Sequence, residues 1–185
     1  DETRWAVGLD LITEGLSSTC TAIEQQVLLD AGCGTGIYTA ALIDRVSRIE
    51  AVDLNPAMLS VAQSKLVNSP DRDRARFWRA SISELPLDDN SVDSIVINQV
   101  LHHLSDRVEN DWPAHRKVLA ECARVLKPHG VIIINSCAHV QLDRGFWFYR
   151  LIPAALAAVK QRTIPLDDLE RLMHASGLDP INRRV

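Results

Sequence analysis

The sequence has no long hydrophobic run, no excess of positive charge and few cysteines, and each absence excludes a class of function. No apolar run approaches the roughly 20 residues that a membrane-spanning helix needs. The 20 Lys and Arg residues are outnumbered by 24 Asp and Glu residues, which gives a net charge of -4 and leaves no basic surface for a phosphate backbone. We therefore expect neither a membrane span nor a nucleic-acid partner.

The four cysteines, Cys20, Cys33, Cys122 and Cys137, contain no CxxC pair, and no Cys/His or HxxxE spacing suggests a metal site. No segment resembles a signal peptide. The sequence predicts reduced thiols, no metal and a cytoplasmic location. Because the chain starts at Asp1 and stops at Val185 where a sixth strand would begin, we expect trimmed ends and incomplete C-terminal strands.

Apolar runs alternate with helical periodicity along the 185 residues, of which 46% are hydrophobic. Strands are predicted at 27–30, 49–53, 76–80, 94–98 and 131–137, and the last run is apolar enough for a strand buried on both faces. Strands that alternate with helices require parallel pairing. We predict a single α/β domain with a doubly wound, mostly parallel Rossmann-like sheet and helices on both faces, in three layers.

Helices are predicted where apolar residues recur every three to four positions, over 39–46 and 119–126, and after the N-cap Asn55 and Pro56. Residues 127–130 should turn the chain into the fifth strand, and a helix after Pro165 should end at Gly177. We divide the single domain into four segments: an N-terminal lid or edge-covering helix (1–26), a ligand-binding core (27–137), an inserted cap (138–165), and a helix with the start of a sixth strand (166–185).

The glycine-rich stretch VLLDAGCGTGIYT, residues 27–39, predicts the ligand. Glycines at 32, 34 and 36 allow a sharp turn and a close backbone approach. The spacing is GxGxG, not the GxGxxG of a dinucleotide site, and Asp30 would repel a diphosphate but attract a cation. Asp53 ends the second predicted strand, where a carboxylate can bind ribose hydroxyls. A nucleoside with a cationic tail is implied.

Four motifs in order resemble the class I S-adenosylmethionine-dependent methyltransferases, in particular the branch of the ubiquinone and menaquinone biosynthesis enzymes. They are LDAGCGTG, AVDLNPAML, SISELPLDDNSVDSIVINQVLHHL and LAECARVLKPHGVIIIN, within residues 27–130 and just beyond. The resemblance implies S-adenosylmethionine as cofactor, S-adenosylhomocysteine as product, and methyl transfer to a small, partly apolar acceptor.

The resemblance also implies cofactor-binding residues. Asp30 and the backbone of Gly32, Cys33, Gly34 and Gly36 would hold the methionine portion, Asp53 the ribose, Leu54 and Met58 the adenine faces, and the Asn98 backbone the ammonium group. Met58 could instead serve helix packing alone. The family usually places an acid where this chain has Ser81, so adenine recognition would depend on the Ser81 hydroxyl or the Ile82 backbone.

A general base is optional, because the sulfonium already makes the methyl group electrophilic. The weak candidates are His103, with its neighbour His102, and His139 and Tyr149. The LHHL stretch that holds the two adjacent histidines is also a common strand-to-helix bend in the family.

The acceptor is expected between the N-terminal helix, with Trp5, and the segment Phe146 to Leu156. This segment contains the aromatic run Phe146 to Tyr149, and Arg150 could anchor an anionic group. These aromatics could also be ordinary core. A sheet edge left unpaired by the missing strand would favour a homodimer. Two other functions stay open: a non-catalytic cofactor-binding or scaffold protein, and an NAD-dependent dehydrogenase, which the GxGxG spacing and Asp30 disfavour.

Overall fold

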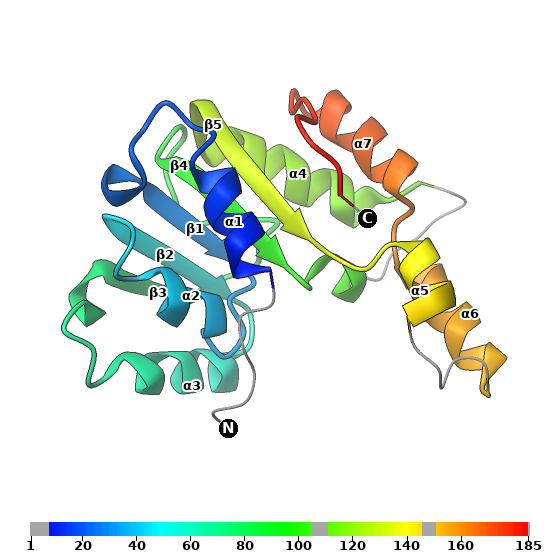
Figure 1. Cartoon of the computed structure of the whole chain (residues 1–185), viewed down its shortest axis with the longest axis horizontal. Coiled ribbons are helices and arrows are strands. Elements are labelled where there is room, and N and C mark those ends of the chain that lie inside the picture. The colour runs from blue at the N-terminus through cyan, green and yellow to red at the C-terminus, as the bar shows by residue number, and fades with distance from the viewer. Residues whose placement is uncertain (1–7, 105–110, 146–150, 185) are drawn as a thin grey trace. The chain divides into compact units, whose positions relative to one another are not determined.

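A single parallel sheet organises the computed structural model, which describes residues 8–104, 111–145 and 151–184 (Figure 1). Its strand order is β3-β2-β1-β4-β5, and every pairing is parallel. The strands are β1 (Val27–Ala31), β2 (Arg48–Asp53), β3 (Ala75–Arg79), β4 (Val92–Asn98) and β5 (Leu126–Asn135). The predicted parallel Rossmann-like sheet is confirmed.

The helices alternate with the strands, as the periodicity predicts. They are α1 (Leu9–Leu16), α2 (Ile37–Leu42), α3 (Pro56–Leu66), α4 (Pro113–Val125), α5 (His139–Gly145), α6 (Pro153–Arg162) and α7 (Leu166–Ala175), with 3-10 turns η1 (Ile23–Gln25), η2 (Arg72–Arg74) and η3 (Leu101–His103). The Asn55 side chain caps α3 by accepting a hydrogen bond from Ala57 N, with Pro56 in the first turn. Both features were predicted from the Asn-Pro pair.

The chain divides into two compact units. The first unit, Asp1–Asn98 with Arg124–Asn135, contains the whole sheet and α1 to α3. The second, Gln99–Ala123 with Ser136–Val185, contains η3, most of α4, and α5 to α7. Every cofactor-binding residue predicted from the sequence lies in the first unit.

One apolar core joins α1, α2 and α3 to the same face of the sheet. Leu28, Ile49 and Val96 point into it from three neighbouring strands, and Ile12 and Leu16 enter it from α1. The opposite face holds other fully buried residues, Leu29, Val52 and Ile95, so both faces of these central strands are covered. This double burial explains why the strands are almost continuously apolar in sequence.

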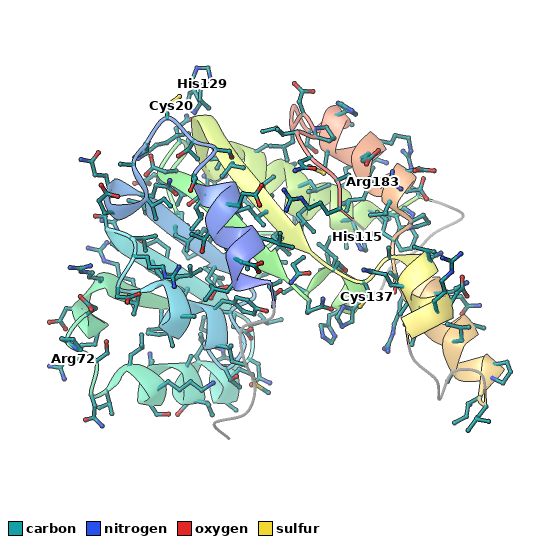
Figure 2. The ribbon with its side chains drawn as sticks, in the orientation of Figure 1. Cys20, Arg72, His115, His129, Cys137 and Arg183 are labelled. Carbon is teal, nitrogen blue, oxygen red and sulfur yellow. The ribbon has the colours of Figure 1, made fainter. Side chains whose placement is uncertain are left out.

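The fifth strand differs from its prediction in position and burial. It begins at Leu126, and residues 127–130 form an irregular stretch within it, because the register shifts between Val92 and Ser94 on β4. His129, exposed at the start of β5 (Figure 2), takes up a positive φ of 64° there. Residues 131–135 are only partly buried, since β5 is the edge strand of the sheet formed by the described residues.

Two further element boundaries were wrong. Helix α2 ends at Leu42 although Val46 stays fully buried, because burial of that face continues into the turn before β2. Residues 180–184 form no strand. In the described part of the chain they pair with no neighbouring strand, and a strand forms its ladder of backbone hydrogen bonds only with such a partner. The helix after Pro165 is confirmed as α7, and Gly177 follows it with a φ of 76°.

Helix α1 packs against the sheet rather than standing apart from it. A β-carbon built on Gly15 would lie 2.7 Å from Ile133 Cγ1 on β5, which shows how closely the two elements approach. This contact favours the interpretation that α1 covers the sheet edge. Trp5 lies outside the described residues.

No helix in the described ranges is long and apolar enough to cross a membrane.

Candidate functional site

The carboxyl ends of β1, β2 and β4 define the candidate site. The chain runs from β1 outward through β2 to β3, and then returns to the other side of β1 to form β4. Open parallel sheets bind ligands at such a reversal of strand order, beyond the carboxyl ends. The glycine-rich loop follows β1 and therefore lies at this reversal.

Backbone hydrogen bonds fix the glycine-rich loop. The amides of Gly32 and Cys33 both donate to Val52 O, at 2.8 and 2.9 Å, and the Gly36 amide donates to Cys33 O at 2.9 Å. Gly32, Gly34 and Gly36 have φ values of 80°, 53° and 73°, a region that residues with a β-carbon rarely occupy. The loop is thus a set of left-handed turns that ties β1 to β2.

Gly34 and Gly36 serve different purposes within this loop. A β-carbon on Gly36 would lie 2.7 Å from Ala62 Cβ and 3.0 Å from Ala62 Cα, so Gly36 allows α3 to pack beside the start of α2. A β-carbon on Gly34 would meet nothing within 4 Å. Gly34 therefore leaves open space at the surface of the loop, where a ligand can approach the backbone.

Asp53 links the glycine-rich loop to the end of β2. Its Oδ2 accepts a hydrogen bond from Gly34 N at 2.8 Å, and its Oδ1 accepts one from Asn55 N at 2.8 Å. The residue is only partly buried, and each carboxylate oxygen can accept a further hydrogen bond. The geometry leaves Asp53 able to bind vicinal hydroxyl groups while it positions the loop.

Asp30 does not face the open site. It is 3% exposed and accepts a hydrogen bond of 2.5 Å from the hydroxyl of Thr39 on α2. Burial raises the pKa of Asp30 to about 6, against the opposing effect of the Thr39 hydrogen bond, and the nearby Asp53 adds to the rise. This geometry favours Asp30 as the residue that joins β1 to α2 and orders the loop, rather than as a direct partner of a cationic ligand group.

Replacing Asp30 with Asn should remove a pH dependence of stability. Because the pKa of Asp30 is raised from 3.8 to about 6 on folding, its contribution to stability is fully present only below pH 3.8 and is lost as the pH rises from there through 6. This difference in pKa between the unfolded and the folded chain corresponds to about 3 kcal/mol of stability. Urea unfolding of the unliganded wild type and variant at pH 4, 5, 6 and 7 measures the difference between them. If the stabilities of the two proteins changed with pH in the same way, the raised pKa of the buried Asp30 carboxyl would be contradicted.

Two exposed apolar side chains follow β2, one in the loop and one on the first turn of α3. Leu54 is 67% exposed and Met58 is 39% exposed, whereas Ile82 is buried. Burial in the core therefore does not explain why apolar residues occupy positions 54 and 58. For Met58, this exposure disfavours the interpretation that it serves helix packing alone. Exposed apolar groups beside a polar site can cover a flat aromatic ring.

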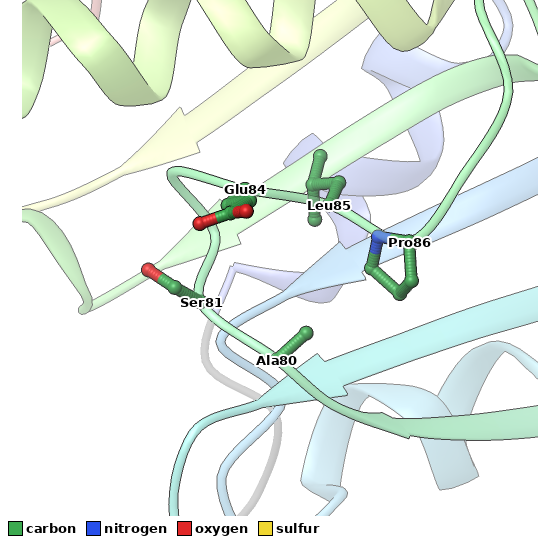
Figure 3. Close-up of a pocket in the computed structure, with 5 residues that line it drawn as sticks. All are labelled: Ala80, Ser81, Glu84, Leu85 and Pro86. Atoms are coloured by element: carbon green, nitrogen blue, oxygen red, sulfur yellow. The ribbon is translucent and has the colours of Figure 1, made fainter.

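A cavity of about 400 Å³ follows β3, lined by Ala80, Ser81, Glu84, Leu85 and Pro86 (Figure 3). Ala80 N donates to Asp53 O at 3.3 Å, so the cavity wall begins directly beside the end of β2. The Ser81 hydroxyl lies 2.8 Å from the Ser83 hydroxyl and accepts a hydrogen bond of 3.2 Å from Ser83 N. Ser81 therefore stabilises its own turn.

Asn98 ends β4 in a chain of polar side chains. Its Oδ1 accepts a hydrogen bond of 2.7 Å from Asn135 Nδ2 at the end of β5. Its side chain also bonds to Tyr38 of α2, whose pKa is raised chiefly by burial. The Asn98 side chain is thus engaged within the fold, which leaves its backbone as the group that the sequence predicts for the ligand.

Cys33 in the glycine-rich loop carries an unreactive thiol. Burial, together with the charges of Asp30 and Asp53, raises its pKa well above the ordinary value, and the thiol form is a poor nucleophile. All four cysteines are free thiols in the structure.

The histidine candidates lie in the second unit. His102 and His103 form the turn η3 with ring centroids 4.1 Å apart, and burial lowers the pKa of His102. His139 Nε2 lies 2.8 Å from Thr163 O; a carbonyl only accepts, so Nε2 carries the hydrogen and cannot act as a base in this arrangement. Tyr149 and the rest of the aromatic run lie outside the described residues.

Two polar residues near the site were not singled out from the sequence. Thr39 was assigned only to a buried helical face, although its spacing from Asp30 places a hydroxyl at the start of the helix after the loop. Glu84 has no periodic pattern around it, and its place in the cavity depends on the turn that begins at Ser81. Among the described residues, no group of three or more His, Cys, Asp or Glu side chains is arranged to hold a metal ion.

Comparisons with known proteins match this geometry. The family described as "Methyltransferase domain" matches residues 29–134, more than half of the chain and nearly all of the sheet.

Two curated relatives share about a third of their aligned residues with the chain. A Mycobacterium tuberculosis protein named "Probable S-adenosylmethionine-dependent methyltransferase" is 32% identical over 145 residues, which are 78% of this chain and 46% of the relative. The demethylmenaquinone methyltransferase of Clavibacter sepedonicus is 32% identical over 133 residues, 71% of this chain and 50% of the relative. The chain spans about half the length of these relatives.

The crystal structure of a SAM-dependent methyltransferase from Aquifex aeolicus superposes with a TM-score of 0.68 at 21% identity, covering 92% of this chain and 79% of that one. At this identity the likeness supports the fold alone.

Proposed function

The chain belongs to the S-adenosylmethionine-dependent methyltransferase family, and from this membership we propose that it binds S-adenosylmethionine and transfers its methyl group to a small acceptor. The observation that carries the proposal is the pairing of Asp53 with Gly34 across the ends of β2 and β1. The Asp53 carboxylate fixes the loop through Gly34 N, and its oxygens can still accept hydrogen bonds from the hydroxyl groups of a ribose. The family resemblance given by the sequence motifs is confirmed.

The residues at the site fit this cofactor in three respects. The open space above Gly34 admits a ligand against the loop backbone. Asp53 offers carboxylate oxygens for the ribose hydroxyls, and the exposed Leu54 and Met58 offer apolar cover for an adenine ring. Gly32 to Gly36 and the Asn98 backbone would bind the methionine portion, and Asp30 would act by ordering the loop rather than by direct contact.

The bound cofactor supplies a methyl group that its sulfonium already makes electrophilic. The protein's main contribution is then alignment of the acceptor in line with the carbon–sulfur bond, about 3 Å from the carbon, and exclusion of water. Among the described histidine candidates, His139 Nε2 is a donor to Thr163 O, and burial lowers the pKa of His102, which makes its ring a weaker base although the neutral ring can still accept a proton. We propose that methyl transfer here depends on positioning more than on proton abstraction.

The acceptor that we propose is small and partly apolar. Helix α6 in the second unit has no buried residue, and Leu151 and Ile152 before it are 72% and 55% exposed. These two adjacent exposed apolar side chains, in the segment where the sequence predicts the acceptor, suit an apolar molecule. The relative from Clavibacter is named for a menaquinone precursor, which is an acceptor of the class proposed here.

Two other functions are less well supported. An NAD-dependent dehydrogenase binds a diphosphate at a helix start that follows a GxGxxG loop, whereas the loop before α2 has the spacing GxGxG. A protein that binds the cofactor without transferring the methyl group would use the same first-unit residues. A transfer assay separates this last case from the proposal.

Incubation with S-adenosylmethionine labelled in the methyl group and a mixed metabolite extract tests the proposal. We expect label in small products that partition into an organic solvent, and no label in the protein or nucleic-acid fraction. The Asp53→Ala variant is the control for transfer that depends on the site. Cofactor binding without any labelled product would support the binding-only function, and label confined to macromolecules would contradict the acceptor class.

A further inference from the structure

We propose that Glu84 is the residue that selects adenine, by accepting a hydrogen bond from the 6-amino group of the cofactor's base. The inference rests on the proposed function and assigns a role to a residue that neither the sequence motifs nor the family comparison identifies. It starts from the cavity after β3, which is lined by Ser81 and Glu84 together (Figure 3).

The cavity lies where the base of a ribose-bound nucleoside would extend. Asp53 pairs with Arg79 in the register of β2 and β3, and the next residue, Ala80, donates its amide hydrogen to Asp53 O. The cavity wall therefore continues from the proposed ribose-binding carboxylate without an intervening element. Leu54, on the chain directly after Asp53, supplies the exposed apolar surface for a flat ring.

Adenine presents an amino donor on the edge that a protein can read, so a selective site needs an acceptor. The Ser81 hydroxyl is poorly suited to accept a hydrogen bond from the adenine amino group, because it already accepts one from Ser83 N and is hydrogen-bonded to the Ser83 hydroxyl. Glu84 is exposed, and no hydrogen bond or ion pair engages its carboxylate within the described ranges. A free carboxylate is also the stronger acceptor of the two.

The turn that contains Ser81 brings the Glu84 carboxylate to the cavity. Glu84 N donates to Ser81 O at 3.0 Å, which closes the turn, and Figure 3 shows the Ser81 hydroxyl and the Glu84 carboxylate extending to the same side of the loop. Ile82, between them in the sequence, is buried, so it anchors the turn from the side of the core. The Glu84 carboxylate is thus an acceptor on the cavity side of the turn, as the amino group of adenine requires.

The backbone of the loop that carries Glu84 is anchored before a ligand binds. Leu85 is buried, and the Arg124 guanidinium donates to Leu85 O at 3.2 Å and to Leu87 O at 2.9 Å. A preorganised acceptor loses less entropy when the ligand binds. Glu84 is therefore a specificity-determining residue on a fixed loop.

Calorimetric titration with two ligands tests this role without any assay of methyl transfer. The ligands are S-adenosylhomocysteine and its analogue built on purine riboside, which lacks only the 6-amino group. For the wild type we expect about tenfold tighter binding of the adenine compound, the scale of one hydrogen bond to a charged group. In Glu84→Ala this preference should disappear, because the amino group has lost its acceptor.

Asp88→Ala is the matched control, since it removes the same charge from an exposed position four residues further along the connection and outside the cavity. It should keep the tenfold preference. A Glu84→Ala variant that binds both ligands with the wild-type ratio would overturn the inference while leaving the proposed function intact. A wild type that binds neither ligand would overturn the proposed function, and the inference with it.

Discussion

Replacing Gly36 with Ala should destabilise the fold by about 3 kcal/mol. The residue has a φ of 73°, which costs a residue with a β-carbon roughly 1–2 kcal/mol. The added carbon would also lie 3.0 Å or less from two carbons of Ala62, one of them backbone, and such overpacking typically costs about 1–3 kcal/mol more. Urea unfolding followed by circular dichroism measures the change.

Gly34→Ala is the matched control for this substitution. Its φ is also positive, at 53°, but its β-carbon would meet nothing within 4 Å. We expect a loss of only about 1 kcal/mol in stability and a larger loss of cofactor affinity, because the methyl group would occupy the open space above the loop. Equal destabilisation by the two variants would contradict the different purposes assigned to these glycines.

Asp53→Ala should weaken binding of S-adenosylhomocysteine by about 10- to 100-fold. Hydrogen bonds to a charged group contribute roughly 1.5–3 kcal/mol, and the variant also loses the bonds that hold Gly34 N and Asn55 N. Calorimetry on protein shown to be folded by its melting curve measures the effect. Asp73→Ala, which removes a carboxylate that is 91% exposed beside Arg72, should bind normally. Unchanged affinity in the Asp53 variant would contradict the proposal that Asp53 binds the ribose of the cofactor.

The sheet and the position of the glycine-rich loop could be predicted because buried parallel strands have a simple signature. Residues such as Leu28 and Leu29 are buried on opposite faces of β1, so the strand reads as an uninterrupted apolar run. The left-handed turns of Gly32 and Gly34 likewise require glycine itself. In both cases the local sequence is constrained by the local structure.

The features that sequence patterns did not predict depend on contacts between separate elements of the fold. The burial of Asp30 follows from its face of β1, which α2 covers with Thr39, and the partial exposure of residues 131–135 follows from the edge position of β5. Glu84 lies in the cavity because a turn and the distant Arg124 hold its loop. Contacts between separate elements leave no periodic pattern in the sequence, so they could not be predicted from one sequence.

The most direct test of the account is a calorimetric titration of the unmodified chain with S-adenosylhomocysteine and, in parallel, with NAD. We propose that an adenosine with an amino-acid tail binds beside the Asp53–Gly34 hydrogen bond, over the open surface of Gly34 and against the exposed Leu54 and Met58. We therefore expect one S-adenosylhomocysteine bound per chain and no binding of NAD at the same concentration. Tighter binding of NAD than of S-adenosylhomocysteine would contradict this proposal.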